Sequence, residues 1–105
     1  MFAFWRTANV GAGIFAIMTS GALAGDPAYG EYLSGECVAC HQKSGADDGI
    51  PSIVGWDEIS FVAVMLSYKQ GGRDNEVMQN VAKSLDQEQI EALAAYFATF
   101  KEPED

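Results

Sequence analysis

The chain places its only two cysteines and its only histidine within five consecutive positions, Cys37-Val38-Ala39-Cys40-His41. A chain of 105 residues forms one small domain at most. Domains of this size commonly depend on disulfides, metals or cofactors to supplement a small hydrophobic core. Two cysteines allow only one disulfide bridge, so the cluster indicates that something other than disulfides fills the middle of the fold.

The first 24 residues have the layout of a secretory signal. A short leader with one basic side chain, Arg6, precedes a mostly apolar run, and Ala22-Leu23-Ala24 presents the small-x-small pattern that signal peptidase recognises. Glycine and hydroxyl residues dilute the run and no basic flank follows it, which favours cleavage over an uncleaved membrane anchor. We therefore expect a signal peptide over residues 1–24, a mature periplasmic domain over residues 25–105, and no membrane span after cleavage.

The mature domain is strongly acidic. The whole chain has a net charge of −9, and loss of Arg6 with the leader takes it to −10. This charge disfavours binding to nucleic acid or to an anionic membrane surface. A protein partner with a basic face is the better expectation.

Three interpretations of the Cys-x-x-Cys-His motif fit the rest of the chain poorly. A thioredoxin-like redox pair begins a helix after a strand, whereas the preceding residues 26–36 read as a short helix. A zinc site needs about four ligands, and the chain has no second Cys/His pair. A disulfide between Cys37 and Cys40 would close a very short loop and contribute little stability.

The remaining interpretation is covalent attachment of one haem. Cys37 and Cys40 would add to the two vinyl groups as thioethers, and His41 would bind the iron through its imidazole. Two residues between the cysteines on a helical turn separate the sulfurs enough to reach neighbouring edges of the porphyrin. The motif, the export signal and the missing second pair all favour haem c as the cofactor, and we expect the haem-free chain to be largely unfolded.

The second axial ligand should be a methionine, because the chain has no other histidine. Met65 and Met78 remain after cleavage. Ile59, Val62, Met65 and Leu66 recur at helical spacing, so we expect Met65 in the core. Met78 follows the loop GGRDNE, where the backbone can bring a side chain to a ligand, and we predict His41 and Met78 as the metal ligands.

The Gly-bounded loop over residues 49–55 is expected to support the histidine. A ligating imidazole usually donates its other ring N–H to a carbonyl, and Pro51 is positioned in the sequence to offer one, although it would also stiffen a turn. The loop would place three apolar side chains along the haem edge: Ile50, Ile53 and Val54. Three further side chains are candidates for hydrogen bonds to the haem propionates: Trp56, Tyr68 and Arg73.

The rest of the chain reads as helical scaffold. Asp86 and Gln89 form a capping box, with Leu85 and Ile90 at the hydrophobic-staple positions. The following helix buries Ile90, Leu93, Ala94 and Phe97 at a period of 3.6 residues, and Lys101 and Pro103 mark its end. We expect this helix to cross the N-terminal one at Gly30. No segment alternates as a strand does, so the prediction is an all-α fold of three to four short helices around one covalently bound haem.

These features resemble the class I c-type cytochromes over essentially the whole mature chain. The resemblance is carried by Cys37-Val38-Ala39-Cys40-His41, by the loop Gly49-Ile50-Pro51, by Met78, and by LAAYF at residues 93–97. It implies a cytochrome c-like fold in which Cys37 and Cys40 anchor the haem, His41 and Met78 are axial ligands, and the Pro51 carbonyl pairs with the histidine ring.

A narrower resemblance connects the chain to the cytochrome subunit of flavocytochrome c sulfide dehydrogenase. It is carried by SFVAVMLSYKQGG and by VMQNVAKSLDQEQIEALAAYF, and it implies a redox partner that is a sulfide-oxidising flavoprotein subunit. The chain departs from that family in having one haem motif where many members have two, and in having Gln42 where glycine is common.

The sequence therefore predicts a periplasmic electron carrier that is not itself an enzyme. The alternative is a haem-based ligand sensor or catalytic haem protein whose sixth ligand is displaceable. No distal histidine is available for such chemistry. A membrane-tethered shuttle would follow if the leader were retained.

Overall fold

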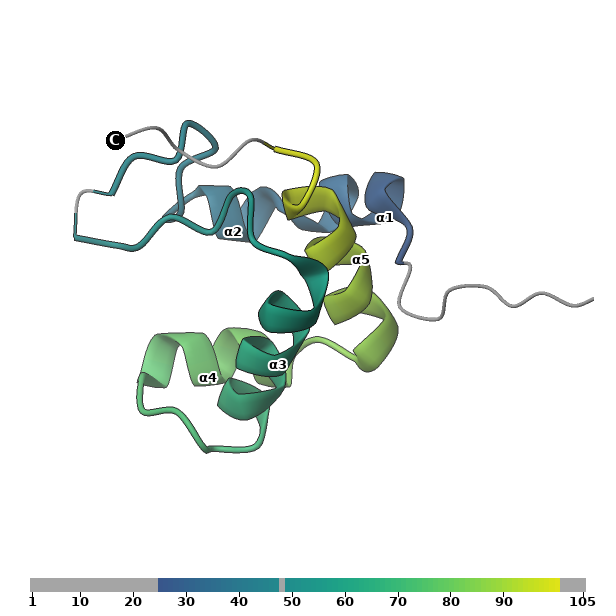
Figure 1. Cartoon of the computed structure of the whole chain (residues 1–105). Coiled ribbons are helices and arrows are strands. Elements are labelled where there is room, and N and C mark those ends of the chain that lie inside the picture. Colours follow the sequence, from purple (N-terminus) through teal and green to yellow (C-terminus); the bar gives the residue numbers. More distant parts are fainter. Residues whose placement is uncertain (1–24, 48, 101–105) are drawn as a thin grey trace, which may run out of the picture.

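The computed structural model describes residues 25–47 and 49–100. Its helices are α1 (Pro27–Leu33), α2 (Gly35–Val38), α3 (Glu58–Lys69), α4 (Glu76–Lys83) and α5 (Gln87–Phe97), as Figure 1 shows. These residues include no β-strand, which confirms the all-α prediction. The helices outnumber the three to four expected because Ser34 interrupts the N-terminal helix, and the short α2 follows at once.

Two sequence predictions concern the ends of the chain. The signal peptide over residues 1–24 and the helix end at Lys101 and Pro103 lie outside the described residues. Within the described part of the chain, no helix has the length and apolar character needed to cross a membrane.

Four helices begin at a side chain that accepts a hydrogen bond from a backbone N–H of the first turn. These side chains are Asp26, Asp57, Asn75 and Asp86. At α5 the predicted capping box is confirmed, because Gln89 N–H donates to Asp86 Oδ1 at 2.8 Å and Asp86 N–H donates to Gln89 Oε1 at 2.9 Å.

The cap of α3 makes a pH-dependent contribution. Hydrogen bonds from Ser60, chiefly from its backbone N–H, hold the pKa of the Asp57 carboxyl below its ordinary value. A carboxyl whose pKa is lowered by folding stabilises the fold at neutral pH, and this stabilisation is lost as the pH falls through the lowered pKa.

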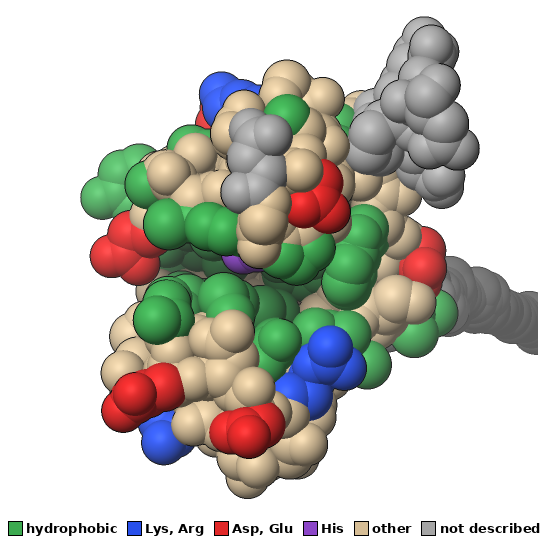
Figure 2. Space-filling view, turned by 90° about the vertical axis from the view of Figure 1, so that its left-hand side faces the viewer, with side chains coloured by type: hydrophobic (Ala, Val, Ile, Leu, Met, Phe, Trp, Pro, Cys, Tyr) green, Lys and Arg blue, Asp and Glu red, His purple; other side chains and the backbone are tan. Residues whose placement is uncertain are grey.

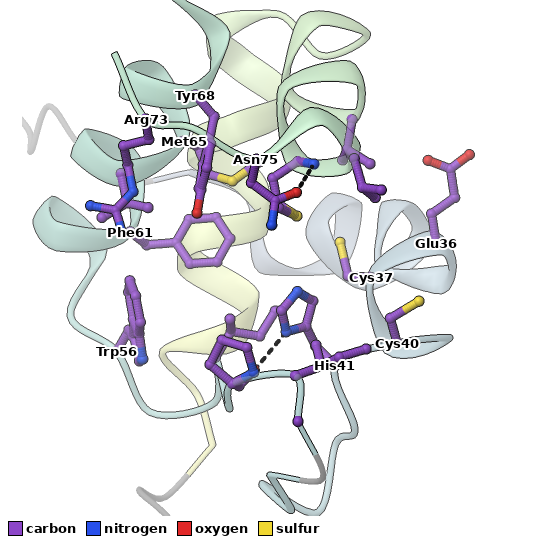
Figure 3. Close-up of a pocket in the computed structure, with 18 residues that line it drawn as sticks. Glu36, Cys37, Cys40, His41, Trp56, Phe61, Met65, Tyr68, Arg73 and Asn75 are labelled. Carbon is purple, nitrogen blue, oxygen red and sulfur yellow. Dashed lines mark hydrogen bonds between the residues drawn. The ribbon is translucent and has the colours of Figure 1, made fainter. Parts of the chain in front are cut away.

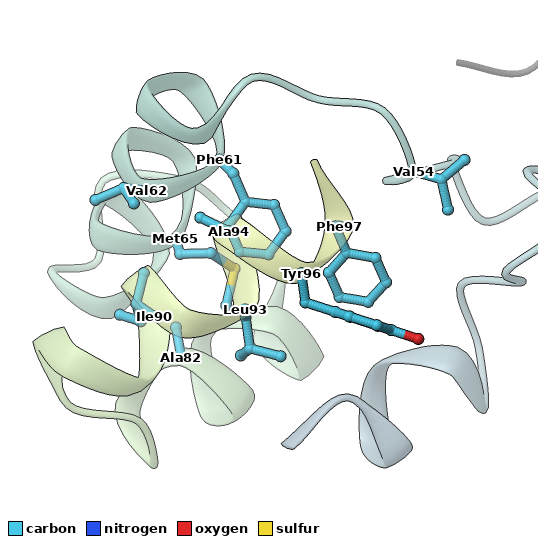
Figure 4. Close-up of a cluster of buried hydrophobic side chains, with 10 residues drawn as sticks. All are labelled: Val54, Phe61, Val62, Met65, Ala82, Ile90, Leu93, Ala94, Tyr96 and Phe97. Atoms are coloured by element: carbon cyan, nitrogen blue, oxygen red, sulfur yellow. The ribbon is translucent and has the colours of Figure 1, made fainter. Parts of the chain in front are cut away.

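Helix α5 forms the centre of the hydrophobic core, as Figure 4 shows. Ile90, Leu93 and Phe97 are fully buried at the predicted spacing. The Phe61 ring of α3 stacks on the Phe97 ring with centroids 5.8 Å apart. Met65 is 5% exposed and belongs to the same cluster, which confirms its predicted burial.

One of the α3 residues predicted to be buried at helical spacing faces solvent instead. Ile59 is 66% exposed, whereas Phe61 is buried. Two residues correspond to about 200° of rotation around an α-helix. Because α3 turns Phe61 toward α5, Ile59 must face solvent.

Val54 also departs from its predicted place at the haem edge. Its side chain is 2% exposed and belongs to the hydrophobic core. The backbone N–H of Gly55 donates to the Phe97 carbonyl at 3.0 Å. This hydrogen bond holds the segment against α5, which explains why the neighbouring Val54 joins the core instead of a cofactor wall.

Helix α1 crosses α5 at Gly30, as the sequence predicted. A Cβ atom at Gly30 would lie 2.0 Å from the carbonyl oxygen of Ala92 and 2.7 Å from the Cβ of Tyr96. Contacts this short are sterically impossible, so the approach of the two helices requires a residue without a side chain.

We therefore expect Gly30→Ala to destabilise the haem-loaded protein by about 1–3 kcal/mol or more, because the helices must separate to admit the methyl group. Gly35→Ala is the matched control, since a Cβ at Gly35 meets nothing within 4 Å. A helical Gly→Ala change there should be neutral or stabilising by up to about 1 kcal/mol. Denaturant titration measures both variants, and equal midpoints would contradict the prediction.

Candidate functional site

The described residues border a cavity of about 430 Å³, within the range of roughly 300–1,000 Å³ that is typical of ligand and cofactor sites. Its lining comes from α2, the segment between α2 and α3, α3 itself, the loop before α4, and α4. Figure 2 shows the cavity as a hollow with hydrophobic side chains along both lips and His41, the only histidine, inside it. The site therefore combines a mainly apolar wall with a single imidazole.

His41 is held in one orientation by the loop that follows it. The backbone turns at Gly49, whose φ of 95° is a conformation that favours glycine. Beyond this turn the Pro51 carbonyl oxygen lies 2.6 Å from His41 Nδ1. A carbonyl only accepts, so Nδ1–H donates, and in the neutral ring Nε2 then carries the lone pair. Nε2 points into the cavity in Figure 3, ready to bind a metal.

Cys37 and Cys40 line the same cavity as His41. The turn is continuous, because the N–H groups of Cys40 and His41 both donate to the Cys37 carbonyl, at 3.1 Å and 2.7 Å. Burial, together with the charge of Glu36, raises the pKa of the Cys37 thiol to about 11. Redox-active Cys-x-x-Cys pairs lower this pKa, so the raised value disfavours the thioredoxin-like interpretation.

Two further observations concern the disulfide and zinc interpretations of the motif. The thiols of Cys37 and Cys40 are not bonded to each other. No group of three or more His, Cys, Asp or Glu side chains lies close enough to hold a metal ion in the part of the chain that the structure describes.

Both methionines among the described residues, Met65 and Met78, line the cavity. Met65 comes from the buried face of α3, and Met78 is half-buried in the first turn of α4. Asn75 caps α4 at this point, because its Oδ1 accepts the Met78 backbone N–H at 3.0 Å. The cap orients the helical turn that carries Met78, while the predicted ligand role of Met78 stays a prediction.

The residues predicted to contact the haem propionates, and two of the three predicted along the haem edge, also line the cavity. Trp56, Tyr68 and Arg73 line it, as do Ile50 and Ile53. The Arg73 guanidinium lies over the Tyr68 ring, 5.2 Å from its centroid. A cation–π contact of this kind holds the positive charge at the cavity wall.

The sequence analysis did not predict some of the residues that line the cavity. They include Asn75, Phe61, Val64, Val77 and Val81. Asn75 had a recognisable signal, because asparagine is a preferred N-cap and an acidic residue, Glu76, follows it in the first turn. Val77 and Val81 of α4 had no such signal, since nothing in the sequence indicates which element lies opposite that helix.

The comparisons with known proteins give the class of this chain. No protein-family model matches it. The cytochrome subunit of sulfide dehydrogenase from Chlorobaculum tepidum is 36% identical over 69 residues, 65% of this chain and 63% of that protein. The thiosulfate dehydrogenase electron acceptor of Thiomonas intermedia is 34% identical over 68 residues, 62% of this chain and 31% of that protein. The chain thus spans less than two thirds of either relative.

For two other relatives, the matched region covers most of the relative's own length. Cytochrome c-554(548) of Halomonas halodenitrificans is 32% identical over 83 residues, 72% of this chain and 98% of that protein. Cytochrome c-553 of Desulfomicrobium norvegicum is 32% identical over 68 residues, 61% of this chain and 85% of that protein. The chain belongs to the c-type cytochromes.

This membership means that the protein carries covalently bound haem c, the group through which c-type cytochromes transfer electrons. The residues of the cavity fit that group. Two thiols, an imidazole with a free nitrogen, two thioethers and a mainly apolar wall meet at one cavity. These are the donors and surroundings that a haem c site requires.

Proposed function

We propose that this chain is an exported electron carrier in which His41 and Met78 are the axial ligands of one haem and Cys37 and Cys40 are its covalent anchors. The observation that carries the proposal is the geometry of His41. Its Nδ1 is committed to the Pro51 carbonyl at 2.6 Å, and its Nε2 faces a cavity that both cysteines and Met78 line.

The residues around the cavity suit transfer of an electron without bond chemistry. The bound haem supplies one iron that cycles between the ferric and ferrous states. The Pro51 carbonyl fixes the ring of His41 and strengthens its imidazole as a donor. A Met78 thioether with His41 raises the reduction potential. The apolar wall excludes water from the site, and burial of this kind also tunes the potential.

The proposal includes export of the chain to the periplasm. Residues 1–24 carry the features of a secretory signal, and cleavage after Ala24 would release residues 25–105 in the periplasm. Attachment of haem to Cys37 and Cys40 is consistent with an exported chain. N-terminal sequencing of the mature protein tests this step, and a retained Met1 would indicate a membrane-tethered shuttle instead.

The proposed electron donor is a sulfide-oxidising flavoprotein subunit. The names of the relatives from Chlorobaculum and Thiomonas connect their cytochromes to sulfide and thiosulfate dehydrogenases. Ile50 and Val77 line the cavity yet are 40% and 68% exposed, which offers apolar contact area beside the haem. The acidic charge of the chain favours a partner with a basic face. Affinity capture from periplasm tests this, and recovery of only unrelated oxidases or reductases would contradict it.

The absorption spectrum of protein matured in a periplasm tests the ligation. We expect a covalently held, low-spin haem with the weak far-red band that arises from a thioether bound to ferric iron. A high-spin spectrum, or one that carbon monoxide changes readily, would mean that Met78 is not a firm ligand. The ligand-sensing or catalytic alternative would then be favoured.

A further inference from the structure

We propose that Lys69, which does not line the cavity, positions Met78 for iron binding by clamping the C-terminal end of α4 to α3. This inference rests on the proposed ligation by His41 and Met78. It assigns a function to the last residue of α3, a side chain that takes no part in the haem site itself.

The clamp is formed by the Lys69 ammonium group and three backbone carbonyls. Nζ donates to the carbonyl oxygens of Ala82 at 3.4 Å and Lys83 at 3.5 Å, and also to that of Leu85. An ammonium group has three donors and no acceptor. Its full donor capacity is therefore directed at the end of α4 and the turn that follows.

The end of α4 is the natural place for such a cation. The last carbonyls of a helix lack partners within the helix, and the helix dipole places partial negative charge there. Hydrogen bonds from a charged donor are roughly twice as strong as neutral ones. Lys69 is half-buried, which reduces the screening of these contacts by solvent.

In the described part of the chain, Lys69 supplies the side-chain hydrogen bonds that join α4 to α3, in addition to the apolar packing of Met78, Val81 and Ala82 against the core. Ala82 is its one buried residue, and Val77 is 68% exposed. At its N-terminal end α4 is held by the Asn75 cap and by a hydrogen bond from Gln79 Nε2 to the Arg73 carbonyl at 2.7 Å. Both are made to the exposed loop before α4, so they tie the helix to a loop and not to α3.

The clamp lies one helical turn from Met78. Met78 and Ala82 are four residues apart, so they share one face of α4. Ala82 is buried on that face, and its carbonyl accepts from Lys69. Release of the C-terminal end would let α4 move away from α3, and Met78 would move with it away from the cavity that Met78 and His41 both line. Lys69 thereby acts on the iron only through the position of α4.

Lys69→Met tests the proposal in the haem-loaded protein, because it keeps the apolar stem and removes the three donors. Carbon monoxide competes for the sixth position, so its affinity for the ferrous protein measures how firmly Met78 binds. We expect the affinity to rise about tenfold or more and the far-red band of the ferric protein to weaken. Lys83→Met is the control, since it removes the same charge from an exposed neighbour in the last turn of α4.

The outcomes separate positioning from simple stability. If Lys69→Met lowers the melting temperature but matches Lys83→Met in carbon monoxide affinity and far-red band, the proposal is wrong. If Lys69→Met does not mature, Lys69→Leu, which also keeps an apolar side chain and lacks donors, is judged by the same criterion. A wild-type protein that lacks the far-red band would contradict the proposed ligation instead, and that result is visible before any variant is made.

Discussion

Replacing Met78 with alanine should abolish the far-red band and lower the reduction potential by on the order of 0.1 V or more, within the roughly 0.8 V that axial ligands span in haem proteins. The reason is the loss of the thioether that favours ferrous iron in His/Met ligation. The ferrous form should also become open to carbon monoxide. Absorption spectra and a redox titration of the matured protein measure these changes.

Met65→Leu is the matched control, because Met65 is the other methionine among the described residues and also lines the cavity. A Met-to-Leu exchange nearly conserves volume, so it should cost less than about 1.5 kcal/mol of stability. We expect Met65→Leu to keep the far-red band. Loss of the band in Met65→Leu, with retention in Met78→Ala, would transfer the ligand role to Met65.

Chain produced without haem should be largely unfolded at 25 °C. The cavity of about 430 Å³ separates α2 and its following segment from α3 and α4. Without haem the apolar side chains that line it stay exposed to water, and each large one forgoes about 1.5–3 kcal/mol of burial, so several together forgo on the order of 10 kcal/mol. That cost is comparable with the whole free energy of unfolding of a typical domain, about 5–15 kcal/mol.

Expression in a compartment without haem attachment supplies this chain for measurement. Far-UV circular dichroism should show little helix, and the amide signals in the NMR spectrum should be poorly dispersed. The matured protein of identical sequence is the control. A well-dispersed spectrum of the haem-free chain would show that α1, α3 and α5 form a sufficient core alone, and the prediction would be wrong.

Local patterns predicted much of the fold. The capping box of Asp86 and Gln89 involves residues three apart, and the burial of Ile90, Leu93 and Phe97 follows from the period of one helix. The pairing of His41 with the Pro51 carbonyl joins residues ten apart in one loop. Gly30 could be predicted as a helix crossing because a glycine inside a helix usually has a packing reason.

Residues whose role depends on distant partners were missed or misplaced. Val54 was expected at the haem edge, but the hydrogen bond from Gly55 to Phe97 draws it into the core. Ile59 was expected inside, but the rotation of α3 that buries Phe61 turns it outward. Asn75 has an N-cap signal in the sequence, yet nothing near it indicates that its helix borders the cavity.

The sequence by itself determined that this protein is a small helical domain with a Cys-x-x-Cys-His site, because helix periods, caps and the motif all depend on residues a few positions apart. The tertiary structure alone decided which side chains border the cavity and what holds α4 in place. Lys69 shows the reason, since its partners are 13, 14 and 16 residues further along the chain. Such contacts depend on how α3 and α4 pack together, and no local pattern in the sequence specifies that packing.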